Sequence, residues 1–120
     1  MEEQGGRRMT VEERIIQTIR PVVPEVSPDL YKGDSTEYCT YNLDELPEGH
    51  GDDRPRAVRC LVQVHYFLPL GRTPIKKRRE LARALLEAGF TYPTVTNASD
   101  SDSQHWVLEC EWVEGLVLDG

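Results

Sequence analysis

Residues 57–68 read AVRCLVQVHYFL, and this stretch decides the fold. Apolar side chains occupy every second position, and the positions between them are mixed in character. A period of two is typical of a β-strand with one buried face and one wetter face. We therefore predict a strand over residues 57–68. Its buried set consists of Val58, Cys60, Val62, Val64, Tyr66 and Leu68, and its wetter set of Arg59, Leu61, Gln63, His65 and Phe67.

Three further segments favour strands. Residues 36–43 are rich in β-forming side chains, and the polar residues 44–55 after them are typical of a loop. Residues 105–113 alternate again, whereas residues 91–97 are interrupted by Pro93 and suit a sheet edge. The expected buried side chains of residues 105–113 are Trp106, Leu108, Cys110 and Trp112, and those of the opposite face are His105, Val107, Glu109, Glu111 and Val113.

Two segments favour helices. Thr10 and Glu13 have the spacing of a capping box, which predicts a helix over residues 10–20. Its apolar face consists of Val11, Ile15, Ile16 and Ile19. A second helix is predicted to start with Thr73 as its cap and Pro74 in its first turn, and to end at Gly89. Its apolar face consists of Ile75, Ala82, Leu85 and Leu86. Residues 21–30 contain three prolines and indicate an extended connector.

The order of these elements predicts an α+β domain with the pattern α-β-β-α-β-β. Two layers are the simplest arrangement, with both helices on one face of a four-stranded, mostly antiparallel sheet. A chain of 120 residues suits one core, so we expect residues 1–120 to form a single domain. Residues 1–9 and 115–120 are expected to be flexible tails.

Composition narrows the possible functions. The net charge of −7 argues against nucleic-acid binding by the whole surface, because such binding depends on neutralising phosphates. No apolar run approaches the ~20 residues that span a bilayer, and the N-terminal residues lack a signal peptide, so we expect the chain to stay in the cytoplasm where it is made. The spacing of Cys39, Cys60 and Cys110 predicts reduced, buried thiols without a metal pattern.

A search for catalytic chemistry finds few signals. His50, His65 and His105 lack the spacing of zinc ligands, and we expect His65 and His105 side by side on the wetter sheet face. A metal site assembled by the fold stays open. So does a nucleophilic pair of Cys60 or Cys110 with His65, although parity places Cys60 on the opposite face from His65.

Paired carboxylates occur at Asp52 and Asp53, at Asp100 and Asp102, and at Glu109 and Glu111. We expect the first two pairs to be solvated loop residues and Glu109 and Glu111 to repel each other on one strand face. The enzymatic alternative is a small site formed by His65, His105, Glu109 and Glu111. The favoured prediction is a protein that is no enzyme and that binds no cofactor or metal.

The least ordinary feature is a run of cations at the start of the second predicted helix, because cations there oppose the helix dipole. The run consists of Lys76, Lys77, Arg78 and Arg79, with Arg72 before it. A solvated helix face and a DNA contact are both alternatives. The functional hypothesis is a contact with an acidic loop of another copy, which would be head-to-tail and could close a ring. The acidic candidates are Asp44, Glu45, Glu48, Asp52 and Asp53.

From about residue 11 to residue 111 the chain resembles the tail terminator, tail completion and minor tail proteins of siphophages. The residues that carry this resemblance are Tyr31, Gly33, Thr36, Glu37, Tyr38, Tyr41, Asn42, Asp52, Asp53, Gln63, Val64, His65, Phe67, Pro69, Gly89, Phe90, Thr91, His105, Glu109, Cys110 and Glu111. They are dispersed and contain no catalytic motif.

The resemblance implies a structural virion protein that forms a ring, usually a hexamer. Such a ring caps the tail tube and offers the docking surface for the head. Its implied partners are the tube protein and the head or neck connector proteins, with DNA only as passing cargo and without a membrane or cofactor. Its implied location is the virion tail or neck, after assembly in the host cytoplasm. A head-to-tail connector or neck adaptor is the alternative within the same class.

Overall fold

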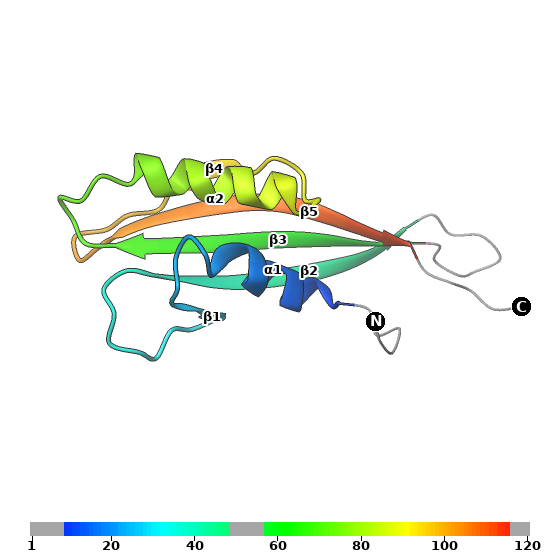
Figure 1. Cartoon of the computed structure of the whole chain (residues 1–120), viewed down its shortest axis with the longest axis horizontal. Coiled ribbons are helices and arrows are strands. Elements are labelled where there is room, and N and C mark those ends of the chain that lie inside the picture. The colour runs from blue at the N-terminus through cyan, green and yellow to red at the C-terminus, as the bar shows by residue number, and fades with distance from the viewer. Residues whose placement is uncertain (1–8, 49–56, 116–120) are drawn as a thin grey trace, which may run out of the picture.

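The computed structural model describes residues 9–48 and 57–115. Within this part, two helices and five strands follow one another along the chain. The elements are α1 Val11–Ile19, β1 Val26–Pro28, β2 Tyr38–Glu48, β3 Ala57–Leu68, α2 Ile75–Glu87, β4 Thr94–Asn97 and β5 Gln104–Gly115. The strands form one sheet in the order β1-β2-β3-β5-β4, and both helices cover the same face of it (Figure 1). The predicted two-layer α+β class is confirmed.

The expected sheet of four strands is wrong in detail, because the described sheet has five strands and is mixed. The additional strand β1 lies in the proline-containing connector and runs parallel to β2. Its ends are held by hydrogen bonds from the Cys39 amide to the Glu25 carbonyl and from the Asp29 amide to the Tyr41 carbonyl. Extended backbone before and at prolines pairs readily at a sheet edge, where one side of the strand needs no partner.

Strand β2 is also longer than predicted. Residues 44–48 continue the strand, although their polar side chains indicated a loop. They pair with residues 57–61 of β3, so a long partner strand supplies the backbone hydrogen bonds that propensity did not predict. The remainder of the predicted loop, with His50, Asp52 and Asp53, lies outside the described residues.

The core lies between β3 and the helices. The predicted strand over residues 57–68 is confirmed, and its alternate side chains Val62, Val64 and Leu68 are at most 1% exposed. Strand β3 is central because Val64 pairs with Tyr41 of β2 on one side and with Leu108 of β5 on the other. Buried side chains of the two helices complete this core: Ile15, Ile19, Leu81, Ala82 and Leu85.

The helix ends confirm one predicted cap and correct another. Thr10 and Glu13 form the predicted capping box, with the Glu13 amide donating to Thr10 Oγ1 and the Thr10 amide to Glu13 Oε1. Thr73 does not cap α2, because Pro74 occupies the N-cap position without a side-chain hydrogen bond. Gly89 follows α2 with a φ of 107°, as expected for a glycine that ends a helix.

The predicted apolar face of α2 is partly wrong. Leu81, Ala82 and Leu85 form the buried face, whereas Ile75 and Leu86 are 45% and 50% exposed. A helix on a two-layer domain contacts the sheet along a narrow stripe, so apolar residues beside that stripe stay in solvent.

The two tryptophans of β5 are half-buried, although sequence predicted full burial. The guanidinium of Arg78 lies 4.3 Å from the centre of the Trp106 ring, and that of Arg14 lies 4.6 Å from the centre of the Trp112 ring. Each ring is therefore covered by a cation from a helix, an arrangement that stabilises both the ring and the charge.

Candidate functional site: the open sheet face

Side chains of β2, β3 and β5 that point away from the helices form the open face of the sheet. No described helix covers this face (Figure 1). Its polar members are Asn42, Asp44, Arg59, Gln63, His65, His105, Glu109 and Glu111, and its apolar members include Leu61, Phe67 and Val107.

A chain of hydrogen bonds crosses the open face. Glu109 Oε2 accepts a hydrogen bond from Gln63 Nε2 at 2.6 Å, and Gln63 Oε1 accepts one from Asn42 Nδ2 at 3.3 Å. Asn42 Oδ1 lies 2.8 Å from Nε2 of His65, and His65 Nδ1 lies 2.8 Å from Nε2 of His105. An amide oxygen can only accept, so His65 Nε2 carries a proton and its Nδ1 accepts from His105 when both rings are neutral. Because the Glu109 carboxylate only accepts, every hydrogen bond in this row is donated toward Glu109.

The predicted juxtaposition of His65 and His105 is confirmed, and burial lowers the pKa of both imidazoles. A positive charge on His105 lowers the pKa of His65 further, since two protonated rings would place like charges within hydrogen-bonding distance. Glu109 acts in the opposite direction on the pKa of His65, as Asp100 does on that of His105. The neutral pair is therefore the form that the fold favours.

We expect the free energy of unfolding to fall as the pH is lowered from about 7.5 to about 5.5. The pKa values of the two histidines in the folded protein lie below the ordinary value of about 6.5. As the pH falls, the unfolded chain therefore takes up these protons at a higher pH than the folded protein does. The stability of the neutral pair is complete above about pH 6.5 and is lost as the pH falls through the folded-state pKa. Urea unfolding at both pH values measures this decrease in the free energy of unfolding. The decrease should be smaller in the variant His105→Gln. A loss of equal size in His105→Gln would contradict the prediction.

The suspected pairing of a cysteine with His65 is excluded by the geometry. Cys60 and Cys110 are buried on the helix-covered face, opposite to the histidines. Burial raises the pKa of the Cys110 thiol to about 12 and raises that of Cys39 as well, so these thiols stay protonated. Within the described residues, no three His, Cys, Asp or Glu side chains are grouped to hold a metal ion.

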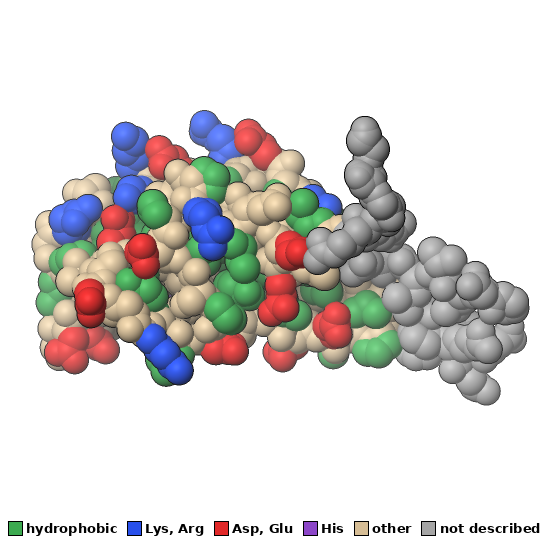
Figure 2. Space-filling view, turned by 60° about the horizontal axis from the view of Figure 1, so that its bottom comes forward, with side chains coloured by type: hydrophobic (Ala, Val, Ile, Leu, Met, Phe, Trp, Pro, Cys, Tyr) green, Lys and Arg blue, Asp and Glu red, His purple; other side chains and the backbone are tan. Residues whose placement is uncertain are grey.

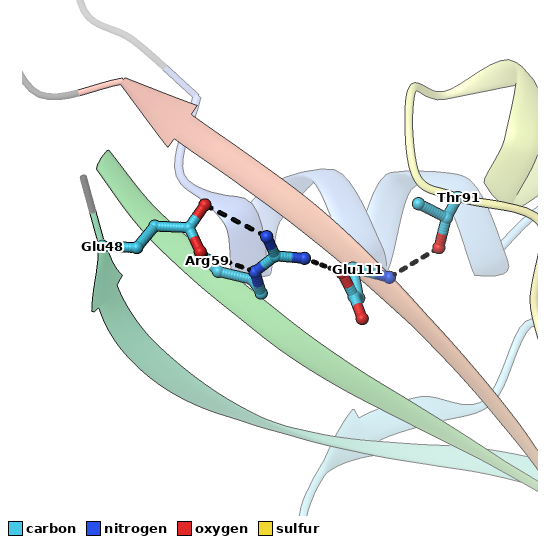
Figure 3. Close-up of polar contacts among 4 residues, drawn as sticks. All are labelled: Glu48, Arg59, Thr91 and Glu111. Atoms are coloured by element: carbon cyan, nitrogen blue, oxygen red, sulfur yellow. Dashed lines mark hydrogen bonds and ion pairs between the residues drawn. The ribbon is translucent and has the colours of Figure 1, made fainter. Parts of the chain in front are cut away.

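Arg59 joins the ends of three strands on the open face (Figure 3). Its Nε lies 2.8 Å from Glu48 Oε2 and its Nη1 lies 2.5 Å from Glu111 Oε1. Arg59 pairs with Glu111 and Gln63 donates to Glu109, so each carboxylate has a partner that offsets the expected repulsion between them. Glu48, a predicted subunit-interface residue, is already held within its own chain.

A row of stacked rings follows the same face at the other end of the strands. The ring centres of Tyr31 and Tyr38 are 4.2 Å apart, those of Tyr38 and Phe67 are 4.8 Å apart, and those of Phe67 and His105 are 4.2 Å apart. These rings stack on one another, so the row supports the loop before β2.

Between the chain of hydrogen bonds and Arg59, the open face is hollowed. The hollow has a volume of about 380 Å³. Its lining includes the aliphatic side chain of Leu61, the 61% exposed ring of Tyr92, and three carboxylates. These carboxylates belong to Asp44, Glu109 and Glu111. Sequence reasoning missed this hollow, because it placed Glu109 and Glu111 on one strand face but assigned Asp44 to a loop.

The predicted cationic run divides between two roles. Lys77 Nζ lies 3.0 Å from Glu37 Oε1, and Arg78 covers Trp106. Burial raises the pKa of the Glu37 carboxyl, but the hydrogen bond from Tyr66 and the charge of Lys77 outweigh burial, so the net shift is downward. Lys77 and Arg78 therefore have partners within their own subunit, whereas their predicted role at a subunit interface stays a prediction.

Lys76 and Arg79 remain on the exposed side of α2, where Arg83 joins them. We call Lys76, Arg79 and Arg83 the outer cations. Arg72 is exposed as well, and its carbonyl accepts a hydrogen bond from Gln104 Nε2 at 2.6 Å. Of the acidic candidates, Asp44 and Glu45 are exposed on β2, and Asp52 and Asp53 lie outside the described residues. Figure 2 shows basic, acidic and apolar side chains interspersed on one side of the molecule.

Comparison with known proteins supports the fold alone. No family model and no curated protein matches the chain. A solved structure known only by a serial identifier aligns with a TM-score of 0.59 over 91% of this chain and 92% of its own. Its sequence is 15% identical, so the similarity defines the class as a two-layer α+β domain without indicating an activity. No helix in the described part is long and apolar enough to cross a membrane.

Proposed function

We propose that the chain is a structural subunit that joins copies of itself into a ring, namely the tail-terminator ring of a siphophage. The open face is the observation that carries this proposal. Three long strands carry apolar side chains there, and no described helix packs on them. Non-obligate protein interfaces have a similar mixture of polar and apolar surface, so this face is compatible with a contact to another subunit.

Charge supports self-association over an unrelated partner. The outer cations lie on α2, over one face of the sheet, whereas Asp44 and Glu109 lie on the other face. Opposite charges on opposite faces attract between neighbouring copies in a head-to-tail sense. Contacts of this kind generate closed rings when the rotation between subunits permits. We propose a tail-terminator ring in particular because the sequence resembles siphophage tail terminators.

Deletion of the gene from a phage that encodes this chain tests the proposal. A missing terminator leaves tube growth unchecked and removes the docking surface for the head. Electron microscopy should then show filled heads beside separate tails of irregular length. Supplying the gene from a plasmid should restore joined particles with tails of uniform length, which controls for effects on neighbouring genes. Normal virions after deletion would overturn the proposed function.

A further inference from the structure

The outer cations have no internal role in the described part of the chain. Lys77 and Arg78 pair with Glu37 and Trp106, whereas Lys76, Arg79 and Arg83 form no ion pair with any described residue. Lys76 also lies in the first turn of α2, where a cation is unfavourable for the helix. The position of the outer cations is therefore explained better by a partner than by the stability of the subunit.

The hollow on the open face has the chemistry that receives a long cationic side chain. Arginine and lysine need an apolar surface for the stem and an acceptor for the charged end. Leu61 and Tyr92 offer the apolar surface, and Asp44 and Glu109 offer carboxylates. The hollow, with a volume of about 380 Å³, has room for such a side chain.

The outer cations of the same chain cannot reach this hollow. The helices pack on one face of the sheet, and the hollow opens on the other. A cation that enters the hollow must therefore come from another molecule. A second copy supplies three exposed cations on one helix, so it is complementary to the hollow in charge.

We infer that the outer cations of one copy, led by Arg79 and Arg83, insert into the hollow of the next copy, with Asp44 and Glu109 as their acceptors. This inference rests on the proposed self-association and names its contact. In this contact Asp44 and Glu109 are the acidic partners, and Glu45 and Glu48 are not. Glu48 is held by Arg59, and Glu45 points to the other face of the sheet.

Two charge-reversed proteins test the contact. The first carries Arg79→Glu and Arg83→Glu, and the second carries Asp44→Lys and Glu109→Lys. Sedimentation velocity at about 0.05 M salt keeps electrostatic screening weak. Each variant alone should associate at least about tenfold more weakly than the wild type, because like charges then face each other in every contact. An equimolar mixture should recover assemblies of wild-type size, since each variant's changed surface complements the other's.

Matched controls separate this contact from a general effect of charge. Glu45→Lys makes the same change as Asp44→Lys on the neighbouring residue of β2, which lies on the opposite face. Arg20→Glu reverses an exposed cation that follows α1. Neither control should weaken association more than about twofold. Circular dichroism of every variant checks that the fold is kept.

The outcomes distinguish the contact from the function. If the wild type associates but the mixture of variants does not recover, the contact is overturned and the ring proposal stands. The contact is likewise overturned if the protein with Asp44→Lys and Glu109→Lys associates as the wild type does. If the arginine variant keeps its association but loses binding to a fluorescent DNA duplex, DNA is the partner of these cations. If the wild type itself stays monomeric, the proposed self-assembly fails.

Discussion

Replacing Leu85 with alanine is expected to lower the free energy of unfolding by about 2–5 kcal/mol. Leu85 is fully buried between α2 and the sheet, in contact with the core that contains Val64 and Tyr66. Removing its side chain loses the transfer free energy of the deleted carbons and leaves a cavity that the surrounding strands cannot close. The same protein should retain its secondary structure below its lower melting temperature.

Leu86→Ala is the matched control for this prediction. Leu86 follows Leu85 in the same helix and is 50% exposed, so the identical chemical change should cost well under half as much. Urea unfolding of the two variants under one set of conditions gives the comparison. Equal losses would show that α2 does not dock on the sheet through the stripe of Leu81, Ala82 and Leu85.

Replacing Gly89 with alanine is the second large effect, with an expected loss of about 1–3 kcal/mol. Gly89 has a φ of 107°, which a residue with a Cβ atom adopts only with strain. A Cβ atom there would also lie 2.7 Å from Cζ3 of Trp112, closer than van der Waals contact permits. The change therefore strains the end of α2 and displaces a ring that Arg14 covers.

Gly71→Ala separates these two causes. Gly71 has a φ of 87°, and a Cβ atom there meets nothing within 4 Å. Its loss should reflect backbone strain alone, and the additional loss in Gly89→Ala then measures the collision with Trp112. Tryptophan fluorescence should change in Gly89→Ala and stay unchanged in Gly71→Ala. Equal stability losses with identical fluorescence would contradict the predicted collision.

The capping box of α1 shows how local chemistry can be read from sequence. Thr10 and Glu13 are three residues apart, so their contact depends on one helical turn and on nothing elsewhere in the chain. The pairing of His65 with His105 was also predictable, because strand parity put both on one face. Parity does not give the strand register. The register brings these histidines to Asn42 and Gln63 and so decides which atom donates in each hydrogen bond.

The cationic run shows what the sequence alone does not resolve. Four consecutive cations look alike in the sequence, yet Lys77 and Arg78 turn toward Glu37 and Trp106 while Lys76 and Arg79 face solvent. Helical geometry separates neighbours by about 100°, so a consecutive run always spreads over several faces. Which face meets a partner depends on where the helix docks.

The sequence by itself determined the central strand, both helices and the class of fold, because alternation, capping and helical periodicity are properties of residues close together in the chain. Only the tertiary structure decided the pairing of β1 with β2, the ion pairs of Arg59 and the hollow between β2 and Tyr92. Each of these joins residues far apart in the chain, and their approach follows from strand register and packing, which no local pattern encodes.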